Sequence, residues 1–231
     1  MSKRQEIRER QARKQRTERI VVIVVVVALV LVAALFLIVP ALLPAGEVAE
    51  PKDALTRPQV KFNGVGDPNA PVKIIEYSDF QCPYCARFAA ETEPKLLEAY
   101  IKTGKVYFEY RSFGEFIGPE SRRSAEAAYC AGDQNKFWEM HDLIFANHTG
   151  ENVGDYTDKR LKAFAQKLGL EMGAFNSCFD NNKYADRVKQ DGLDGAQAGV
   201  QATPSFTING KLFEGAQPFE AFQKEIDALL K

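Results

Sequence analysis

The sequence contains little cysteine and histidine and almost no net charge. Four cysteines in 231 residues are too few for a small protein built on disulfides. A net charge of −1 gives no reason to expect a nucleic-acid-binding protein by charge alone. No P-loop, GxGxxG or HExxH motif is present, so a nucleotide-binding protein or a zinc protease has no support. The rest is an ordinary globular composition, with 45% hydrophobic and 26% charged residues, enough for one to two domains.

Charge and hydrophobicity are distributed unevenly at the N-terminus. Residues 1–19 carry eight basic and three acidic side chains, a net charge of +5, so the other 212 residues sum to −6. Residues 20–39 are apolar without a break. Twenty residues at about 1.5 Å each span about 30 Å, the thickness of the apolar part of a bilayer. The sequence therefore predicts a transmembrane helix over residues 20–39.

The basic tail predicts the orientation of this helix. Positive residues stay on the cytoplasmic side, so we expect residues 1–19 in the cytoplasm and everything after Pro40 outside it. A cleaved signal peptide is one alternative, but the apolar run exceeds the usual roughly 7–15 residues and no clear A-x-A site follows. A buried core helix is another, but it rarely lacks a polar face altogether. We expect a retained single-pass anchor in the cell membrane, with the folded part in a compartment where disulfides persist.

The exported part divides into a linker and one domain. Residues 40–57 contain three prolines and one glycine and show no periodicity, which predicts an extended extracytoplasmic linker. Residues 58–231 then form the globular domain. Their order is strand, helix, strand, a block of helices, a hairpin and a last helix. We expect strands over 59–62, 72–78, 106–113, 205–208 and 211–213, and helices over 82–102, 120–131, 134–147, 158–168, 171–181, 184–196 and 218–231.

This order predicts an α/β protein with a central sheet and helices on both faces. The helical block, about residues 115–199, is too long for a connection within the sheet and should form a subdomain beside it. Pro94 lies within the first predicted helix and should kink it. Asn209-Gly210 between two short apolar runs is a strong hairpin signal.

The motif Cys82-Pro83-Tyr84-Cys85 follows a predicted strand and opens a predicted helix. Unpaired N–H groups and the helix dipole stabilise a thiolate there, so the pKa of Cys82 should be lowered. Pro83 lies where a missing N–H costs nothing. The spacing lets the second thiol close a small disulfide, so the pair can alternate between dithiol and disulfide. An inert bridge and half of a metal site are the alternatives, but neither a metal nor another cofactor is expected.

Three segments of this sequence resemble a known family. Residues 72–85, ending in the Cys-Pro-Tyr-Cys motif, look like the active-site segment of the DsbA-like thioredoxin-fold proteins, closest to the membrane-anchored BdbD-like branch. Residues 199–210 and 215–218 resemble the family's cis-proline loop with its hairpin and the turn before the last helix. The resemblance covers about residues 66–231. It implies a thioredoxin fold with an inserted helical subdomain, and a protein thiol–disulfide oxidoreductase.

The resemblance also implies roles for individual residues. Cys82 resembles the exposed nucleophile that forms a mixed disulfide with the substrate, and Cys85 resembles the buried thiol that resolves it. Pro204 resembles the cis-proline that faces the active site, and Thr203 the residue before it. A cis bond is possible at such a position because its energy gap for an X–Pro bond is small. Tyr84 stands where DsbA has a histidine and offers no positive charge to a neighbouring thiolate.

Cys130 and Cys178 lie outside this motif, in the predicted helical block. An oxidising compartment favours their pairing. Of the three connectivities that four cysteines allow, only 82–85 with 130–178 leaves the redox pair free. We expect a structural disulfide, the alternative being two separate buried thiols.

Glu76 interrupts an otherwise apolar or aromatic stretch of the strand before Cys82. It could point to water if the other face of the strand is solvated. It could instead lie beneath the disulfide near Cys85, where burial would raise its pKa and let it exchange a proton with that thiol. Thioredoxin-fold proteins of this group often have an acid there, so the resemblance favours the second interpretation.

Taken together, the sequence predicts an anchored extracytoplasmic oxidoreductase that introduces disulfides into exported proteins. The resemblance implies reoxidation by a membrane partner of the DsbB or VKOR type. A disulfide reductase or isomerase is an alternative of the same class. A copper metallochaperone is disfavoured because only three methionines and two histidines occur. A binding module with structural cysteines is the third alternative.

Overall fold

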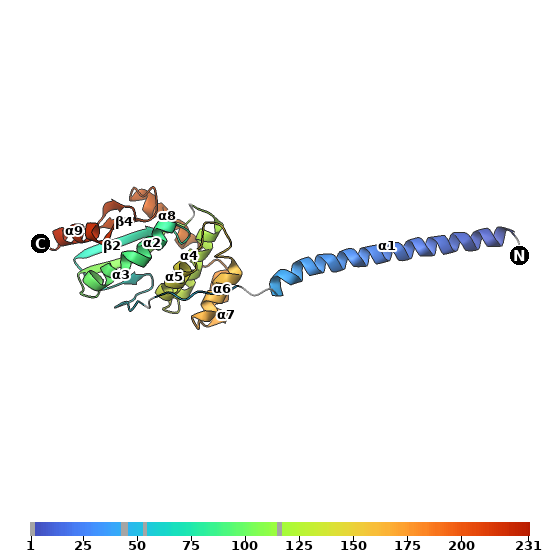
Figure 1. Ribbon diagram of the computed structural model, residues 1–231, viewed down its shortest axis with the longest axis horizontal. Coiled ribbons are helices and arrows are strands. Elements are labelled where there is room, and N and C mark those ends of the chain that lie inside the picture. Colours follow the sequence, from blue (N-terminus) through green and yellow to red (C-terminus); the bar gives the residue numbers. More distant parts are fainter. Residues whose placement is uncertain (1–2, 43–45, 53–54, 115–116) are drawn as a thin grey trace. The chain divides into compact units, whose positions relative to one another are not determined.

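The computed structural model describes residues 3–42, 46–52, 55–114 and 117–231 in two compact units, Met1–Ala45 and Gly46–Lys231. Helix α1 (Lys3–Leu42) makes up the first unit as one helix of 40 residues, blue in Figure 1. It takes in most of the predicted basic tail as well as the predicted span. Its segment Arg19–Phe36 is long and apolar enough to cross a membrane.

The second unit is built on a five-stranded mixed sheet in the order β1-β3-β2-β4-β5. Strand β2 (Val72–Ser78) lies parallel to β3 (Val106–Ser112) and antiparallel to β4 (Ser205–Ile208). The edge strands β1 (Gly64–Val65) and β5 (Lys211–Glu214) pair antiparallel with β3 and β4. Strand β2 is thus central, and the cysteine motif directly follows its end.

Helices cover both faces of this sheet. Phe88 of α2 (Pro83–Glu91) packs with its ring centroid 4.6 Å from that of Phe206 in β4. Phe222 of α9 (Phe219–Leu229) lies 5.6 Å from Phe88 and completes this layer. Apolar burial of such aromatic side chains is the main stabilising contribution of the interface.

The opposite face of the sheet is covered by α8 (Ala185–Gln197). Gly195 allows a close approach there, because a Cβ at this position would lie 2.8 Å from the rings of both Tyr77 and Phe113. Any larger residue would push α8 away from the sheet.

The predicted helix 82–102 is not continuous. It divides into α2, a short helix α3 (Glu93–Leu96) and a π-helical turn η1 (Leu97–Ile101). Pro94 lies at the start of α3, where its missing N–H and its ring prevent α2 from continuing. Glu93 is the first residue after this break and is 2% exposed.

A layer of helices lies beside the sheet, between β3 and β4 in the chain. It consists of α4 (Pro119–Gly132), α5 (Phe137–Ala146), α6 (Asp158–Lys167) and α7 (Met172–Asp180). Residues 115–116, at the predicted start of the helical block, lie outside the described residues. Figure 1 shows these helices grouped at one end of the domain.

Cys130 in α4 and Cys178 in α7 are joined by a disulfide, with their Cα atoms 5.8 Å apart. Replacing both cysteines with alanine should lower the free energy of unfolding by about 4 kcal/mol, because the bridge closes a loop of 48 residues and restricts the unfolded chain. Urea denaturation of the domain, monitored by circular dichroism, measures this loss. Disulfide exchange at Cys82 should remain near the wild-type rate in the same variant. A variant of unchanged stability would contradict a structural role for the bridge.

The predicted strand 59–62 is wrong. Gln59 and Phe62 have positive φ angles of 47° and 55°, which an extended strand cannot contain. The edge pairing with β3 begins two residues later, at Gly64. Phe62 instead packs against Tyr129 of α4, with ring centroids 5.6 Å apart, so it anchors this turn to the helical layer.

Part of the predicted linker contacts the domain. We call residues 46–57 the entry segment; its residues 53–54, like residues 43–45, lie outside those described. Ala49 exchanges two backbone hydrogen bonds with the Asn147 side chain, both 2.9 Å long. Glu50 forms an ion pair of 2.6 Å with Lys167. The compact unit therefore begins at Gly46, twelve residues before the boundary that the composition predicts.

Candidate redox site

The end of β2 leads directly into the cysteine motif. The N–H of Cys82 donates to the Asp79 carbonyl at 3.0 Å, and the N–H of Gln81 donates to the Asp79 side chain at 2.8 Å. Cys82 is the residue before α2 and has an extended backbone, with φ −76° and ψ 121°. Pro83 takes the first helical position, as its fixed φ favours. The turn thus delivers the Cys82 sulfur to the positive end of the helix.

A second loop, between α8 and β4, lies against this sulfur. The Thr203–Pro204 peptide bond is cis. The Cys82 thiol donates a hydrogen bond of 3.3 Å to the Thr203 carbonyl. Ser205, the next residue, begins β4 and pairs with Tyr77 of β2. The sheet therefore brings together two segments separated by 121 residues in the sequence.

The two thiols differ in their surroundings. Both are free in this structure; the Cys82 residue is 5% exposed and Cys85 is not exposed at all. A hydrogen bond from Cys85 contributes most to lowering the pKa of Cys82 to about 6, and Thr203 and the N–H groups at the helix start add to it. Burial raises the pKa of Cys85 well above that of an ordinary thiol. Cys82 is less exposed than the sequence resemblance implies, while its neighbour Tyr84 is 56% exposed.

Alkylation of the reduced protein should therefore distinguish the two thiols. Cys82 should react with a half-maximal rate near pH 6, whereas an ordinary thiol has a pKa of about 8.5. Cys85 should stay unmodified over the same range because burial keeps it protonated and out of reach. Peptide mass spectrometry after short pulses of iodoacetamide gives the rate at each cysteine. Faster labelling of Cys85 would reverse the roles of the two residues.

Glu76 lies in the middle of β2, in register with Tyr110 of β3 and Phe206 of β4. It is not exposed to water, which excludes the solvated interpretation. Neither carboxyl oxygen has a hydrogen-bond partner within the described residues. Burial first and the charge of Glu93 second raise the pKa of Glu76 well above that of an ordinary carboxyl group. The negative charge of Glu76 would in turn raise the pKa of Cys85, so the two groups lie close enough to interact.

Three charged residues of the site were not predicted from the sequence. Asp79 is fully buried, and burial raises its pKa to about 6. Its position directly after a buried strand and before the motif is a signal from which its role in the site could have been predicted. Glu93 and its partner Arg57 are 2% and 3% exposed at their side chains. No local pattern marks these two, because one lies in a predicted helix and the other in a predicted linker.

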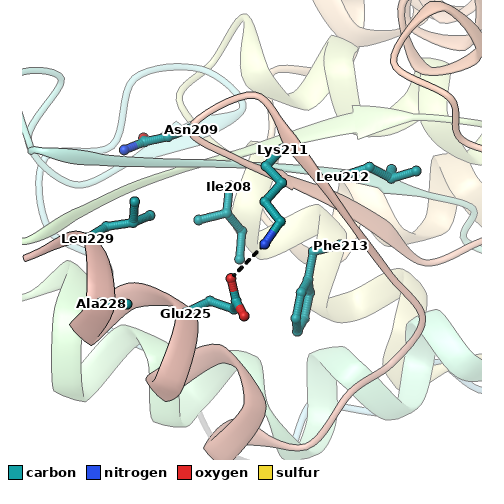
Figure 2. A pocket seen from close by; sticks show the side chains of 8 residues that line it. All are labelled: Ile208, Asn209, Lys211, Leu212, Phe213, Glu225, Ala228 and Leu229. Atoms are coloured by element: carbon teal, nitrogen blue, oxygen red, sulfur yellow. Dashed lines mark hydrogen bonds and ion pairs between the residues drawn. The ribbon is translucent and has the colours of Figure 1, made fainter.

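Two surface cavities lie away from these cysteines. One of about 180 Å³ lies between the β4–β5 hairpin and α9, where Lys211 and Glu225 form an ion pair (Figure 2). Its lining residue Ile208 pairs with Ile74, near the beginning of β2, whereas Cys82 follows the end of that strand. The other, of about 210 Å³, is lined by Arg87 of α2 and Pro218 before α9. The reactive sulfur is thus separate from both cavities.

Comparisons with known proteins agree with this geometry. The model of a family described as thioredoxin matches residues 61–228. The "Probable disulfide bond formation protein D" of Bacillus anthracis is 32% identical over 172 residues, which cover 72% of this chain and 77% of that protein. The crystal structure of oxidised BdbD from Bacillus subtilis superimposes with a TM-score of 0.68 at 23% identity, covering 80% of this chain and 99% of that one. The last likeness confirms the predicted fold.

A different kind of protein matches the same domain. The "Na(+)/H(+) antiporter NhaA 1" of Salinispora arenicola is 33% identical over 163 residues, which cover 70% of this chain. The matched part is 24% of the antiporter, so this chain spans about a quarter of that relative's length. The similarity therefore concerns one region of a larger membrane protein.

Proposed function

Because this chain belongs to the thioredoxin family, among the DsbA-like thiol–disulfide oxidoreductases of the BdbD type, we propose that it introduces disulfides into exported proteins. Its oxidised Cys82–Cys85 pair accepts two electrons from two substrate thiols. The observation that carries this proposal is the contrast between the two sulfurs: a pKa lowered to about 6 at Cys82 and one raised by burial at Cys85. Cys82 is therefore the attacking and leaving group, and Cys85 closes or opens the disulfide.

The same contrast supports oxidation as the direction of the reaction. A stabilised Cys82 thiolate favours the reduced form of the pair and makes its disulfide a better oxidant. The name of the Bacillus anthracis relative, a probable disulfide bond formation protein, supports oxidation over reduction or isomerisation. Each turnover leaves the pair reduced, so a further oxidant is needed. We assign this step to a membrane protein of the DsbB or VKOR type that passes the electrons on.

Buried Glu76 has a role in the same cycle. When a substrate thiolate attacks the Cys82 sulfur, the S–S bond breaks and its electron pair goes to the Cys85 sulfur. A buried thiolate is costly without a proton. Protonated Glu76 supplies that proton, and its carboxylate takes it back when Cys85 must attack again.

The reduction potential of the Cys82–Cys85 pair tests the direction. Equilibration with glutathione buffers should give a value towards that of DsbA, about −120 mV, and away from that of thioredoxin, about −270 mV. The ratio of reduced to oxidised protein is read by alkylation and mass spectrometry. A potential near the thioredoxin value would make the protein a reductase instead.

The basic tail and α1 support an anchored protein with its catalytic domain outside the cytoplasm. Protease added to intact spheroplasts should digest residues 46–231 and leave the N-terminal tail protected. Antibodies against epitope tags at the two ends report which fragment survives. A fully protected chain would contradict the extracytoplasmic location. Release of the domain without any protease would indicate that the helix is cleaved.

A further inference from the structure

The entry segment carries a buried cation into the domain. The Arg57 side chain is only 3% exposed. Its guanidinium group donates two hydrogen bonds to Glu93 Oε1, at 3.1 and 2.7 Å. It donates two more to the two oxygens of Asp142 in α5, both at 2.7 Å. The guanidinium also lies 4.6 Å from the ring centre of Trp138. Such fork-shaped pairing holds a planar cation in one orientation.

Glu93 joins this cation to the redox site. Its Oε1 takes both hydrogen bonds from Arg57, while its Oε2 is buried without a partner within the described residues. Both carboxyl oxygens of Glu76 are likewise buried without a hydrogen-bond partner within the described residues. The charge on Glu93 is second only to burial among the causes that raise the pKa of Glu76. Of these two neighbouring buried carboxyl groups, Glu93 forms the ion pair with Arg57, whereas Glu76 has no hydrogen-bond partner within the described residues.

The ion pair with Arg57 places a counter-charge beside Glu93 and none beside the oxygens of Glu76. A buried carboxylate without a partner is costly and takes up a proton instead. Burial acts to lower the pKa of Arg57, but the charges of Glu93 and Asp142 outweigh it and raise the pKa. Arg57 is therefore always charged and stabilises the Glu93 carboxylate. Two like charges in one site are unfavourable, so the proton stays on Glu76.

We propose that Arg57 is a positioning residue of the redox site: the entry segment supplies the cation that holds Glu93 as a carboxylate, and this carboxylate keeps a proton on Glu76 for delivery to Cys85. The inference rests on the proposed function and deepens it. It makes the segment that follows the membrane helix part of the electrostatics of the cysteine pair.

The proton balance of the cycle shows where this matters. In the oxidised protein, Glu76 is protonated. Attack of a substrate thiolate forms the bond to Cys82 and breaks the Cys82–Cys85 bond, and the Glu76 proton moves to the Cys85 sulfur. The second substrate thiolate attacks the substrate sulfur of this mixed disulfide, which breaks the bond to Cys82 and releases the Cys82 thiolate. On reoxidation this thiolate attacks the oxidising disulfide, whose S–S bond breaks; one of its sulfurs leaves as a thiolate and the other stays bonded to Cys82. Cys85 then returns its proton to Glu76 and attacks the Cys82 sulfur, and the partner thiolate leaves.

A pH profile of this last step reports the ionisation of Glu76. The titratable groups that face Glu76 come from three elements: the two cysteines at the start of α2, Glu93 in α3 and Tyr110 in β3. Arg57 and Asp142 complete the charged surroundings of Glu93. The His141 ring is hydrogen-bonded to Asp142 at 2.9 Å. Cys82 titrates near pH 6 and is already bound in the mixed disulfide during this step.

The full-length protein in detergent is reduced and mixed with excess oxidised glutathione, and the glutathione–Cys82 mixed disulfide is followed by acid quench and mass spectrometry from pH 4 to 9. The rate of its resolution should rise with pH as Glu76 becomes a base. In Arg57→Gln and in Glu93→Gln the midpoint of this rise should fall by about one to two pH units, because the negative charge beside Glu76 is lost. Arg57→Lys keeps the cation and should recover most of the shift.

Controls separate this effect from a loosened entry segment. Lys167→Gln removes the surface ion pair of Glu50 without changing charge near Glu76, so its midpoint should equal that of the wild type. The Arg57→Gln, Glu93→Gln double variant should shift no further than either single variant, because both remove one and the same charge. If Arg57→Gln does not fold, Glu93→Gln carries the test, because it leaves the Arg57–Asp142 pair intact.

Two results would overturn the inference. One is an unshifted midpoint in Glu93→Gln. The other is a wild-type profile identical to that of Glu76→Gln. In either case the exchange reaction itself continues, and the proposed function stands. A wild-type protein that forms no mixed disulfide at any pH would instead remove the proposed function.

Discussion

The Cys85→Ser variant should accumulate mixed disulfides with its protein substrates. Cys82 keeps its place at the helix start and the backbone N–H groups there that lower its pKa. The serine hydroxyl can donate the hydrogen bond that the Cys85 thiol gave, so Cys82 still attacks. The thiol that would release the substrate is absent. Because Cys85 is the only other free cysteine that the structure describes, no second thiol of the chain can replace it. We expect resolution of the mixed disulfide to be lost almost completely.

Cells that express this variant should show high-molecular-weight species on non-reducing gels that collapse on reduction. The matched control is Cys82→Ser, which leaves the buried Cys85 in place and should form no adducts, because that thiol is unexposed and its pKa is raised. Adducts that persist in Cys82→Ser would show that another cysteine attacks. Their absence from Cys85→Ser would show that the substrates are not protein thiols.

Local sequence pattern was sufficient for the centre of this site. A strand of apolar residues, a turn and Pro83 at a helix start place Cys82 where its thiolate is stabilised, and each step depends on neighbouring residues. The β4–β5 hairpin around Asn209-Gly210 was predictable for the same reason, since Asn209 and Gly210 both adopt the positive φ that such a turn requires. Resemblance to a known family supplied what local pattern could not, namely that the loop of Thr203 and Pro204 faces the active site; the structure adds the hydrogen bond from Cys82 to the Thr203 carbonyl.

The charged network beneath the cysteines was not predictable from pattern. Arg57 contacts partners 36 and 85 residues away, in elements whose relative positions depend on the complete fold. Its neighbours in the sequence are rich in proline and polar residues, and this composition indicated a linker. Composition indicates which segments favour water, but it does not show which residues they contact in the folded protein. Glu93 was not predicted for a different reason: the sequence indicated one continuous helix over 82–102, whereas α2 ends at Glu91 and Glu93 begins a separate short helix.

A domain cut at residue 58, where the composition begins to look globular, would lack Arg57 and retain Glu93 and Asp142. Both carboxyl groups are largely buried, and the pKa of Asp142 is lowered by hydrogen bonds from His141 and Arg57 against the opposing effect of burial. Removing the cation would leave two buried acids uncompensated. The start of the domain therefore depends on charge balance as well as on chain packing, and it has to lie before Arg57.

Replacing Glu76 with glutamine should slow the resolution of the mixed disulfide by about a hundredfold or more at neutral pH, since a positioned acid or base contributes about 10²–10⁴-fold. The amide has nearly the same shape but cannot exchange a proton with Cys85. The rise of the rate with pH should disappear in this variant as well. Attack by Cys82 should stay close to the wild-type rate, because the Cys85 hydrogen bond and the helix start that lower its pKa remain. Single-turnover kinetics with oxidised glutathione measure both steps on one sample.

Stability gives an independent measurement on the same variant. The pKa of Glu76 is raised in the folded protein, chiefly by burial, so the folded state binds this proton more tightly than the unfolded chain does. Its contribution to stability is therefore fully present below the unfolded pKa of about 4.3 and is lost as pH rises through the folded pKa. Glu76→Gln should remove this decline, and its advantage over the wild type in urea denaturation should grow from pH 5 upwards. Equal slopes of stability against pH, together with unchanged resolution, would show that Glu76 is a packed side chain with no part in the proton transfer.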